Sequence, residues 1–458
     1  MSSSLLLLLL LLFIVPAFML EFRYHSNREM EQYLLQVNAS NPDITHLYSI
    51  GTTVRGQQLW VLALGDSPDH HTVGVPEFKY VANMHGNEVL GRVLLLQLIE
   101  ELVRGYRSSE TWSLQLLHST RIHILPTMNP DGFDNADNNC VYVQGRFNSN
   151  GADLNRGFPD TFAGLRQQPN VNEQKMEPEV RAVVDWLKSE TFVLSANLHG
   201  GALVASYPYD NSNGGPELVG GASVTPDNDV FLHLAKVYSS SHAHMSKGNQ
   251  CEDVSPFQDG VTNGYQWYPL EGGMQDFNYV WAQCLELTLE LSCCKFPPPE
   301  DLPALWTDNK QALLAYIQQV HLGVKGRVFD AAGVPVQGAL VEVRGRQNLC
   351  PFRTNRFGEY YRLLLPGNYS FTVTYPDHEV LTDTLAVPYG PDQFSAKQHD
   401  FLLRRTTTLT GLAPTEPAQA DLTPTCSQRL NLAGGGATAR WSALTVGFSL
   451  VVLRSLVD

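Results

Sequence analysis

The stretch Phe78–Val103, FKYVANMHGNEVLGRVLLLQLIEELV, places a short apolar run, a polar turn and a long amphipathic segment in immediate succession. Apolar residues recur every three or four positions in its second half, which is the period of an α-helix: Leu90, Val93, Leu94, Leu98 and Leu102. Leu95, Leu96 and Ile99 widen this face. The stretch therefore predicts a strand over Phe78–Met84 and a well-buried helix over Leu90–Val103, the repeating unit of α/β folds.

Strand-like and helical runs continue to alternate from about residue 21 to residue 299, which predicts an α/β domain with a mixed or parallel central sheet and flanking helices. A helical piece then continues to residue 320. Further strands are expected at Arg121–Leu125, Thr191–Leu198 and Cys284–Leu291. In the last of these, leucines occupy alternate positions and share one face. Glu286, Thr288 and Glu290 therefore share the other.

The pattern changes after residue 320. Residues 321–404 contain short strand candidates separated by turns, at Gly323–Phe329, Ala339–Arg344, Glu359–Leu365 and Tyr369–Thr374. Their spacing predicts a small all-β unit, an antiparallel β-sandwich. Residues 405–440, rich in Thr, Pro, Ala and Gly, are typical of a flexible stalk.

The two ends carry targeting signals. Residues 1–20 hold an apolar run from Leu5 to Val15 that is typical of a secretory signal peptide, although a retained membrane anchor is the alternative. Small residues at 431–435, within a small-residue stretch, precede an apolar tail at 441–458. This order predicts a lipid-attachment site and a tail removed on glycolipid (GPI) anchoring. A transmembrane helix is the rival, and Arg454 within the tail disfavours it.

Composition limits the class of protein. The chain has 458 residues with 46 Asp+Glu against 31 Lys+Arg and 43% hydrophobic residues, which excludes a disordered protein. A formal charge of −15 argues against nucleic acid and fits a cationic substrate. An odd count of 7 cysteines is ordinary in a secreted, disulfide-bonded chain. Asn38 and Asn368 begin glycosylation triplets.

Three residues form a candidate metal site. His85 and Glu88 lie at a predicted strand-to-helix junction, and His199 ends another predicted strand. The carboxyl ends of strands in an open α/β sheet form the ligand crevice, so these side chains are expected to converge. Two His and one Glu leave a fourth zinc position open for water, as in catalytic zinc sites.

Hydrolysis with such a metal also needs a general base and a means of holding the substrate. Glu290 is the candidate base, with Glu286 on the same face an equal rival on pattern alone. Arg146, Asn155 and Arg156 lie in a loop-like stretch that is suited to binding a carboxylate. The alternative for that stretch is a surface ion-pair segment.

Together these residues closely resemble the zinc metallocarboxypeptidases, in the branch that carries a transthyretin-like domain after the catalytic one. The resemblance covers residues 21 to about 403 and rests on six motifs: His85-Gly86-Asn87-Glu88, Asn129-Pro130-Asp131-Gly132, Asp153-Leu154-Asn155-Arg156, Asn197-Leu198-His199-Gly200-Gly201, Thr262-Asn263-Gly264-Tyr265 and Glu286-Leu287-Thr288-Leu289-Glu290-Leu291-Ser292. It implies a metallocarboxypeptidase-like catalytic domain over residues 21–320 and a transthyretin-like sandwich over residues 321–404.

The resemblance also implies a role for each site residue. His85, Glu88 and His199 would bind one Zn²⁺ per chain, and Glu290, not Glu286, would be the general acid/base. Arg146 would stabilise the oxyanion. The substrate's terminal carboxylate would be held by Asn155 and Arg156, and Tyr268 would close over the bound residue.

This branch prefers C-terminal Arg or Lys, so the expected substrates are peptides and proteins with those termini. The implied specificity acid is Asp210, with Gln275 nearby and Glu286 adding negative potential; the alternative for Asp210 is an ordinary turn residue.

The resemblance suggests the pairs Cys140–Cys294, Cys251–Cys293 and Cys350–Cys426, with Cys284 free. The expected protein is a monomer on the extracellular face of the plasma membrane.

Two other functions compete with this one. A catalytically silent binding protein could keep the fold, but silent relatives usually lose a metal ligand or the glutamate, and all of these residues are present. An active enzyme with another terminal preference is disfavoured by Asp210.

Overall fold

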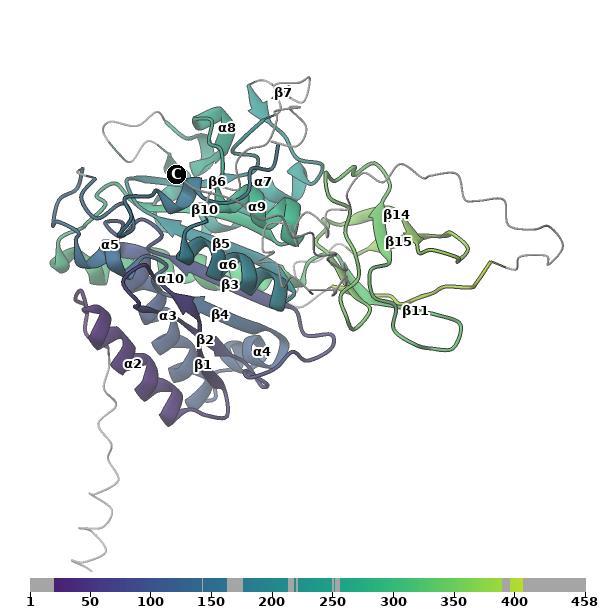
Figure 1. The fold of residues 1–458 in the computed structure, drawn as a ribbon, viewed down its shortest axis with the longest axis horizontal. Helices are drawn as coiled ribbons and strands as arrows, with labels where there is room; N and C mark the ends of the chain where they lie inside the picture. The colour runs from purple at the N-terminus through teal and green to yellow at the C-terminus, as the bar shows by residue number, and fades with distance from the viewer. Residues whose placement is uncertain are drawn as a thin grey trace, which may run out of the picture.

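The computed structural model describes residues 20–141, 143–162, 176–212, 218–219, 221–248, 251, 256–388 and 396–406. A large α/β domain is followed along the chain by a β-sandwich that lies beside it (Figure 1). The expected signal peptide apart from its last residue, the stalk beyond residue 406, the lipid-attachment site and the apolar tail lie outside the described residues.

The α/β domain is organised around a mixed sheet. Among the described residues, eight strands pair in the order β1-β2-β4-β3-β5-β10-β6-β9. β3, β4, β5 and β10 are mutually parallel. β2 runs antiparallel to both of its neighbours, β1 and β4, whereas β6 is antiparallel to β10 and parallel to β9. The strands are β1 (Thr45–Thr52), β2 (Gln58–Leu64), β3 (Glu77–Ala82), β4 (Arg121–Leu125), β5 (Phe192–His199), β6 (Ala202–Tyr207), β9 (Val261–Asn263) and β10 (Leu285–Ser292). The predicted mixed sheet is confirmed.

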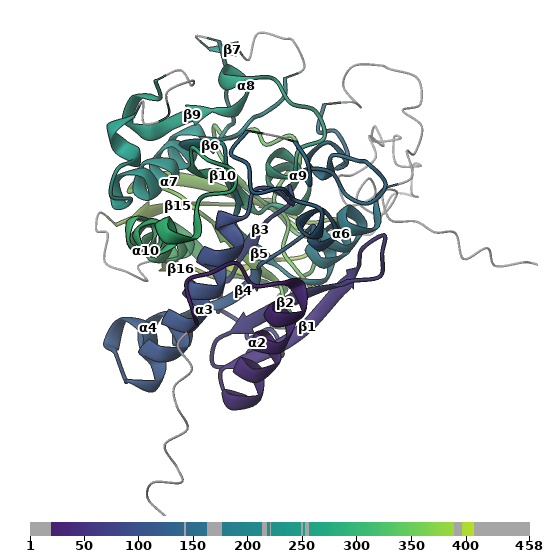
Figure 2. The same ribbon diagram turned by 90° about the vertical axis from the view of Figure 1, so that its left-hand side faces the viewer.

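Helices cover both faces of this sheet. One face packs against α2 (Asn27–Ser40), α3 (Leu90–Arg107), α4 (Thr111–Ser119), α7 (Asn228–Ser241) and α10 (Leu302–Gln318). The other packs against α6 (Pro178–Ser189) and α9 (Met274–Ala282), and Figure 2 shows these two helices across the sheet from α3, α7 and α10. Side chains of β3 alternate accordingly, because Tyr80 belongs to the first cluster and Val81 to the second. Short elements complete the domain: α5 (Pro130–Asp134), α8 (Gly264–Trp267), β7 (Leu218–Val219) and β8 (Ala222–Ser223).

The central predicted elements lie close to their expected positions. β4 spans Arg121–Leu125 as predicted, and α3 begins at Leu90. The helix ends at Arg107 rather than Val103, because Tyr106 still packs against the core and Arg104 forms ion pairs with Glu101 and Glu110. Those contacts lie outside the apolar repeat from which the helix was predicted.

The β-sandwich consists of two sheets around its own core. One sheet has β11 (Val324–Phe329) between β13 (Glu359–Arg362) and the short β16 (Lys397–Gln398), with β17 (Phe401–Leu402) also paired to β11. The other has β12 (Leu340–Val343), β14 (Gly367–Thr374) and β15 (Leu381–Val387). The predicted small β-sandwich is confirmed, but the expected antiparallel pairing is wrong for β16 and β17, which run parallel to β11. β16 and β17 lie far from β11 in the sequence, so their pairing with β11 leaves no local pattern.

Asp227, just before α7, joins the two domains. Its carboxylate accepts hydrogen bonds from Tyr279 of the α/β domain at 2.7 Å and from the sandwich residues Asn348, Arg346 and Arg362 at 2.8, 3.0 and 3.3 Å. A carboxylate with this many donors is well satisfied although it is buried.

His71 makes a second link between the domains. Its ring nitrogens lie 2.6 Å from Glu77 in β3 and 2.6 Å from Glu359 in β13. Burial by itself lowers the pKa of His71, but the hydrogen bonds to Glu359 and Glu77 outweigh burial and raise it to about 9. The imidazolium is therefore shared between two carboxylates at neutral pH.

Within the described ranges, two disulfides join distant parts of the chain. They pair Cys140 with Cys294 and Cys251 with Cys293, as expected, and Cys284 is a buried free thiol. The expected partner of Cys350, Cys426, lies outside the described residues.

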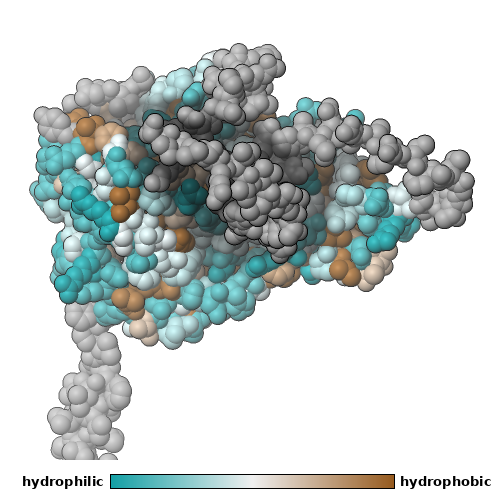
Figure 3. Space-filling model, in the orientation of Figure 1, coloured by the Kyte–Doolittle hydropathy of each residue, from teal (hydrophilic) through white to brown (hydrophobic). Residues whose placement is uncertain are grey.

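The surface drawn in Figure 3 is mostly hydrophilic, with apolar residues in small separate groups among the coloured residues. In the part of the chain that the structure describes, no helix combines the length and apolarity needed to cross a membrane.

Candidate active site

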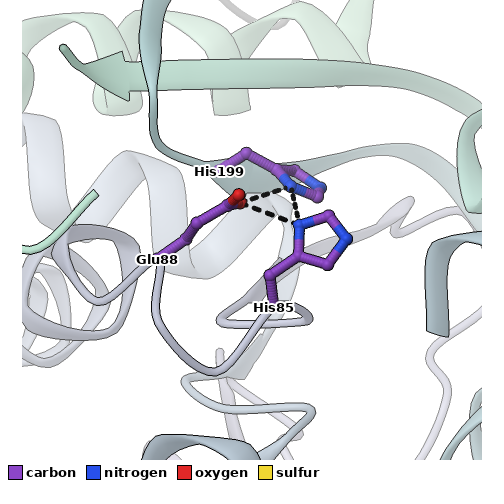
Figure 4. Close-up of side chains that lie close together, drawn as sticks. All are labelled: His85, Glu88 and His199. Atoms are coloured by element: carbon purple, nitrogen blue, oxygen red, sulfur yellow. Dashed lines mark hydrogen bonds and ion pairs between the residues drawn. The ribbon is translucent and has the colours of Figure 1, made fainter. Parts of the chain in front are cut away.

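His85, Glu88 and His199 converge at the carboxyl ends of β3 and β5 (Figure 4). Glu88 Oε2 lies 2.9 Å from His85 Nδ1 and 2.8 Å from His199 Nδ1, and the two ring nitrogens are 3.2 Å apart. All three side chains are buried. The convergence follows from the topology, because β3 and β5 are adjacent and parallel and their carboxyl ends meet at one edge of the sheet.

This cluster fits a zinc ion. Donor atoms that lie about 2.0–2.1 Å from a tetrahedral ion are about 3.3 Å apart, close to the separations seen here. Burial by itself raises the pKa of Glu88, but His85 and His199 outweigh it and hold that pKa well below its usual value. An ionised carboxylate with two imidazole nitrogens is a donor set that zinc prefers.

Asp153 orients one of the ligands from outside the cluster. Its Oδ1 lies 3.1 Å from His85 Nε2, so the ring's other nitrogen faces Glu88. Its Oδ2 accepts hydrogen bonds from Arg146 at 2.9 and 3.1 Å. A carboxylate behind a ligating His is a common feature of metal sites. Asp153 belongs to one of the sequence motifs, but no role was predicted for it; the acid directly before the Leu-Asn-Arg run was the available signal.

No role was predicted from the sequence for Lys295 either. Its Nζ donates to Glu88 Oε1 at 2.6 Å and to the carbonyl oxygen of Gly200 at 2.8 Å. A lysine near a stretch of prolines carries no pattern that would mark it, and only the folded chain brings it to Glu88.

The two acids on β10 have different surroundings. Glu286 is buried against Lys79 Nζ at 2.9 Å, with Ser195 and Asn197 also donating to it. Glu290 faces the cavity instead, and no hydrogen-bond partner of its Oε2 is found among the described residues. Burial, followed by the charge of Glu88, raises the pKa of Glu290 to about 7. Glu290 is thus placed to exchange a proton near neutral pH, whereas Glu286 is committed to an internal ion pair.

A cavity of about 150 Å³ connects these groups. It is lined by His85, Glu88, Arg146, Asn155, His199, Gly200, Gly201, Ala202, Ser206, Asp210, Gly264, Trp267, Tyr268, Leu270, Thr288, Glu290 and Lys295. Every predicted site residue except Arg156 and Gln275 is on this wall.

Of the two residues expected to bind a terminal carboxylate, Asn155 lines the cavity and Arg156 does not. Asn155 is buried, and its side-chain oxygen accepts from the backbone of Met274 at 3.0 Å, which leaves its amide nitrogen as the donor. Arg156 is exposed and donates to the carbonyl of Asn155 at 3.0 Å. Tyr268, 44% exposed, stands at the mouth of the cavity.

Asp210 lies on the cavity wall but is only 7% exposed. Gln275 donates to its Oδ1 at 2.8 Å, and the other end of the Gln275 amide accepts from the backbone of Thr288 at 2.7 Å. Gln275 therefore holds Asp210 in place rather than facing the cavity. Burial is the main cause that raises the pKa of Asp210 to about 7; Glu286 adds to the rise and Arg156 opposes it.

Two neighbours define the position of Asp210. Asp276, unnoticed in the sequence, accepts from the backbone N–H of Asp210 at 2.9 Å and from that of Asn211 at 3.0 Å. A side chain at Gly264 would place its Cβ 1.8 Å from Asp210 Oδ1, so only glycine fits there.

Comparisons with known proteins agree with this geometry. The family profile described as zinc carboxypeptidase matches residues 30–312, and that of the carboxypeptidase regulatory-like domain matches residues 323–395. The chain is 55% identical to mouse (Mus musculus) carboxypeptidase M over 385 residues, covering 84% of this chain and 85% of that protein. It is 45% identical to the human (Homo sapiens) carboxypeptidase N catalytic chain over 391 residues, 81% of this chain and 84% of that one.

A solved structure gives independent support for the fold. The crystal structure of thrombin activatable fibrinolysis inhibitor superimposes with a TM-score of 0.52 at 18% identity, covering 65% of this chain and 75% of that chain. At this identity the similarity concerns the fold alone.

Proposed function

The chain belongs to the zinc carboxypeptidase family, and from that premise we propose that it releases a single C-terminal Arg or Lys from peptides and proteins. The observation that carries the proposal is the position of Asp210. The buried carboxylate of Asp210 accepts a hydrogen bond from the neutral amide of Gln275 and lines the same cavity as the metal cluster and Glu290. A guanidinium or ammonium group entering the cavity would supply the missing positive charge.

His85, Glu88 and His199 hold one Zn²⁺ per chain in this proposal. Bound there, zinc lowers the pKa of water to about 7 and polarises a carbonyl group. Glu290 takes the proton of the attacking water and passes it to the amine that leaves, a role suited to a carboxyl group with a pKa of about 7. Arg146 directs its guanidinium toward the negative charge that develops on the carbonyl oxygen.

Asn155 and Arg156 bind the free carboxylate of the substrate. The two residues are consecutive in the chain, and Arg156 can offer a charged, bidentate donor. Tyr268 covers the bound residue from the mouth of the cavity. Selection of the last residue follows, because a residue within a chain has no carboxylate for these donors.

The same reasoning extends to the setting of the enzyme. Two disulfides within the described residues support an oxidising compartment, hence the secretory pathway. The enzyme is a monomer held on the extracellular face of the plasma membrane by a lipid near residues 431–435. Its catalytic domain covers residues 21–320 and its sandwich residues 321–404.

The test is hydrolysis of matched peptides ending in Arg, Lys, Leu or amidated Arg, with and without a zinc chelator. We expect chelator-sensitive release of free terminal Arg and Lys, weak release of Leu and none from the amide. Equal release of Leu would reject the specificity. No release from any peptide by the zinc-loaded protein would favour a binding protein that keeps the fold.

A further inference from the structure

The position of Asp210 depends on helix α9. Gln275, in the first turn of this helix, donates to Asp210 Oδ1 at 2.8 Å, and the next residue, Asp276, accepts from the Asp210 backbone N–H at 2.9 Å. Both of these supporting residues are buried. A displacement of α9 would therefore also displace the acid that faces the cavity.

The sandwich domain contacts the same helix one turn further along. Tyr279 donates its hydroxyl hydrogen to Asp227 at 2.7 Å, and the hydroxyl oxygen accepts from Asn348 Nδ2 at 2.8 Å. Burial raises the pKa of Tyr279, and the charge of Asp227 adds to the rise, so this hydroxyl stays protonated. Asn348 also donates to Asp227 at 2.8 Å. The three side chains thus form a closed ring of hydrogen bonds across the domain boundary.

A second contact with the sandwich lies at the end of α9. Gln283, which directly follows the helix, accepts from the backbone N–H of Arg353 in the sandwich at 2.7 Å. The φ of Gln283 is +58°, in the left-handed region that favours glycine, but glycine would have no side-chain oxygen to offer Arg353. The sandwich therefore holds α9 at two points.

Apolar packing connects Tyr279 to the residue that precedes Asp210. The ring of Tyr279 packs against that of Tyr209, with ring centroids 5.8 Å apart. Phe352 and Leu363 of the sandwich belong to the same buried cluster as these two rings. Densely packed interiors transmit strain, so a shift of the Tyr279 ring would reach Asp210.

We propose that the β-sandwich takes part in substrate selection, with Asn348 as a positioning residue that fixes α9 and, through it, Asp210. The inference rests on the proposed preference for terminal Arg or Lys and adds a second domain to it. A sandwich that only stabilised the enzyme would act differently, because a smaller folded fraction reduces the cleavage of every peptide alike. The ratio of kcat/KM for terminal Arg to that for terminal Leu therefore separates the two roles.

The experiment measures this ratio for the full-length, zinc-loaded enzyme and for Asn348→Leu, which removes the amide at a similar side-chain volume. The ratio should fall by about fivefold to tenfold, within the range for networks that couple two sites, with KM for the Arg peptide changing more than kcat. The control is Lys325→Met, which removes a 2.9 Å hydrogen bond from the sandwich to the carbonyl of Gly74, away from α9, and should leave the ratio unchanged. A ratio in Asn348→Leu equal to that of the parent enzyme would overturn the proposal.

Tyr279→Phe tests the same link from the α/β domain, because it keeps the buried ring and removes only the hydroxyl. This variant should also lower the ratio, and it decides the question should Asn348→Leu fail to fold. The double variant should lose no more than the larger single loss, since both changes break one link. Single losses that multiply would reject the path through Tyr279.

The parent enzyme itself separates this inference from the proposed function. A parent enzyme without a preference for terminal Arg would reject the proposed function and the inference with it. A preference that both variants retain would reject the inference alone.

Discussion

The two ends of the cavity surround a buried carboxylate in opposite ways. Glu88 is enclosed by donors, with two imidazoles, Lys295 and Arg146 around it, and its pKa is held low. Asp210 accepts a side-chain hydrogen bond from the amide of Gln275. Burial and the negative charge of Glu286 raise the pKa of Asp210. The surroundings of Glu88 suit a permanently bound cation, whereas those of Asp210 suit a cationic side chain that arrives with each substrate. The surroundings, rather than the residue type, assign the roles.

The largest expected effect comes from Glu290, which lines the same cavity as Glu88 and Asp210. Glu290→Gln should reduce cleavage by about 10²–10⁴-fold, the usual contribution of a general acid or base. Zinc content and affinity for a terminal Arg product should both remain, because neither cation site is touched. Metal analysis and product binding check this; retained activity would move the proton-transfer role elsewhere.

The substitution Asp210→Asn changes only the Asp210 end of the cavity. Loss of the charge should lower kcat/KM for terminal Arg by about 10–100-fold, in line with 1.5–3 kcal/mol for a hydrogen bond to a charged group. Cleavage of a peptide ending in Leu should change little, which makes it the internal control. Equal losses for both peptides would reject Asp210 as the specificity acid.

The raised pKa of Asp210 predicts a pH-dependent preference. Asp210 is ionised above pH 7 and neutral below it, so the ratio of kcat/KM for terminal Arg to that for terminal Leu should fall as the pH drops through about 7. The limiting slope is about tenfold per pH unit. Ionisation of Glu290 affects both peptides alike and cancels in the ratio. A ratio independent of pH between about 5 and 8 would contradict the assignment.

Gln275→Met should give the smallest change. It removes the hydrogen bond to Asp210 but keeps the charge, so the Arg-to-Leu ratio should fall by about fivefold, the equivalent of about 1 kcal/mol. The loss should be smaller than that in Asp210→Asn under the same assay. An equal or larger loss would mean that Gln275 contacts the substrate directly.

Prediction of the fold from sequence succeeded where periodicity was strong. The leucines of β10 and of α3 repeat with the period of their element, and both elements lie within a few residues of the expected ranges. β15 was missed because several of its residues are exposed and its sequence, LTDTLAV, has a weak alternation. The parallel pairing of β16 and β17 depends on contacts across the whole sandwich, which local patterns do not encode.

The structure brings together the candidate metal residues predicted at strand ends, whereas two residues that support them were not predicted. The metal cluster followed from His85 and His199 at the ends of two strands. The choice between Glu286 and Glu290 needed the family resemblance, because the pairing of Glu286 with Lys79 spans 207 positions in the sequence. Asp153 and Lys295 contact His85 and Glu88 over long separations in the chain, and one sequence offers no period or spacing for such contacts.

The contacts of Asp227 bear on how the two domains unfold. Cutting the chain at residue 320 would strip this buried carboxylate of three donors and deprive His71 of one of its two acids. Such losses cost about 1–3 kcal/mol each, a large part of the stability of an ordinary domain. The boundary that composition marks in the sequence is therefore not a boundary of cooperativity, and calorimetry of the intact chain should show one melting transition in which both parts unfold together.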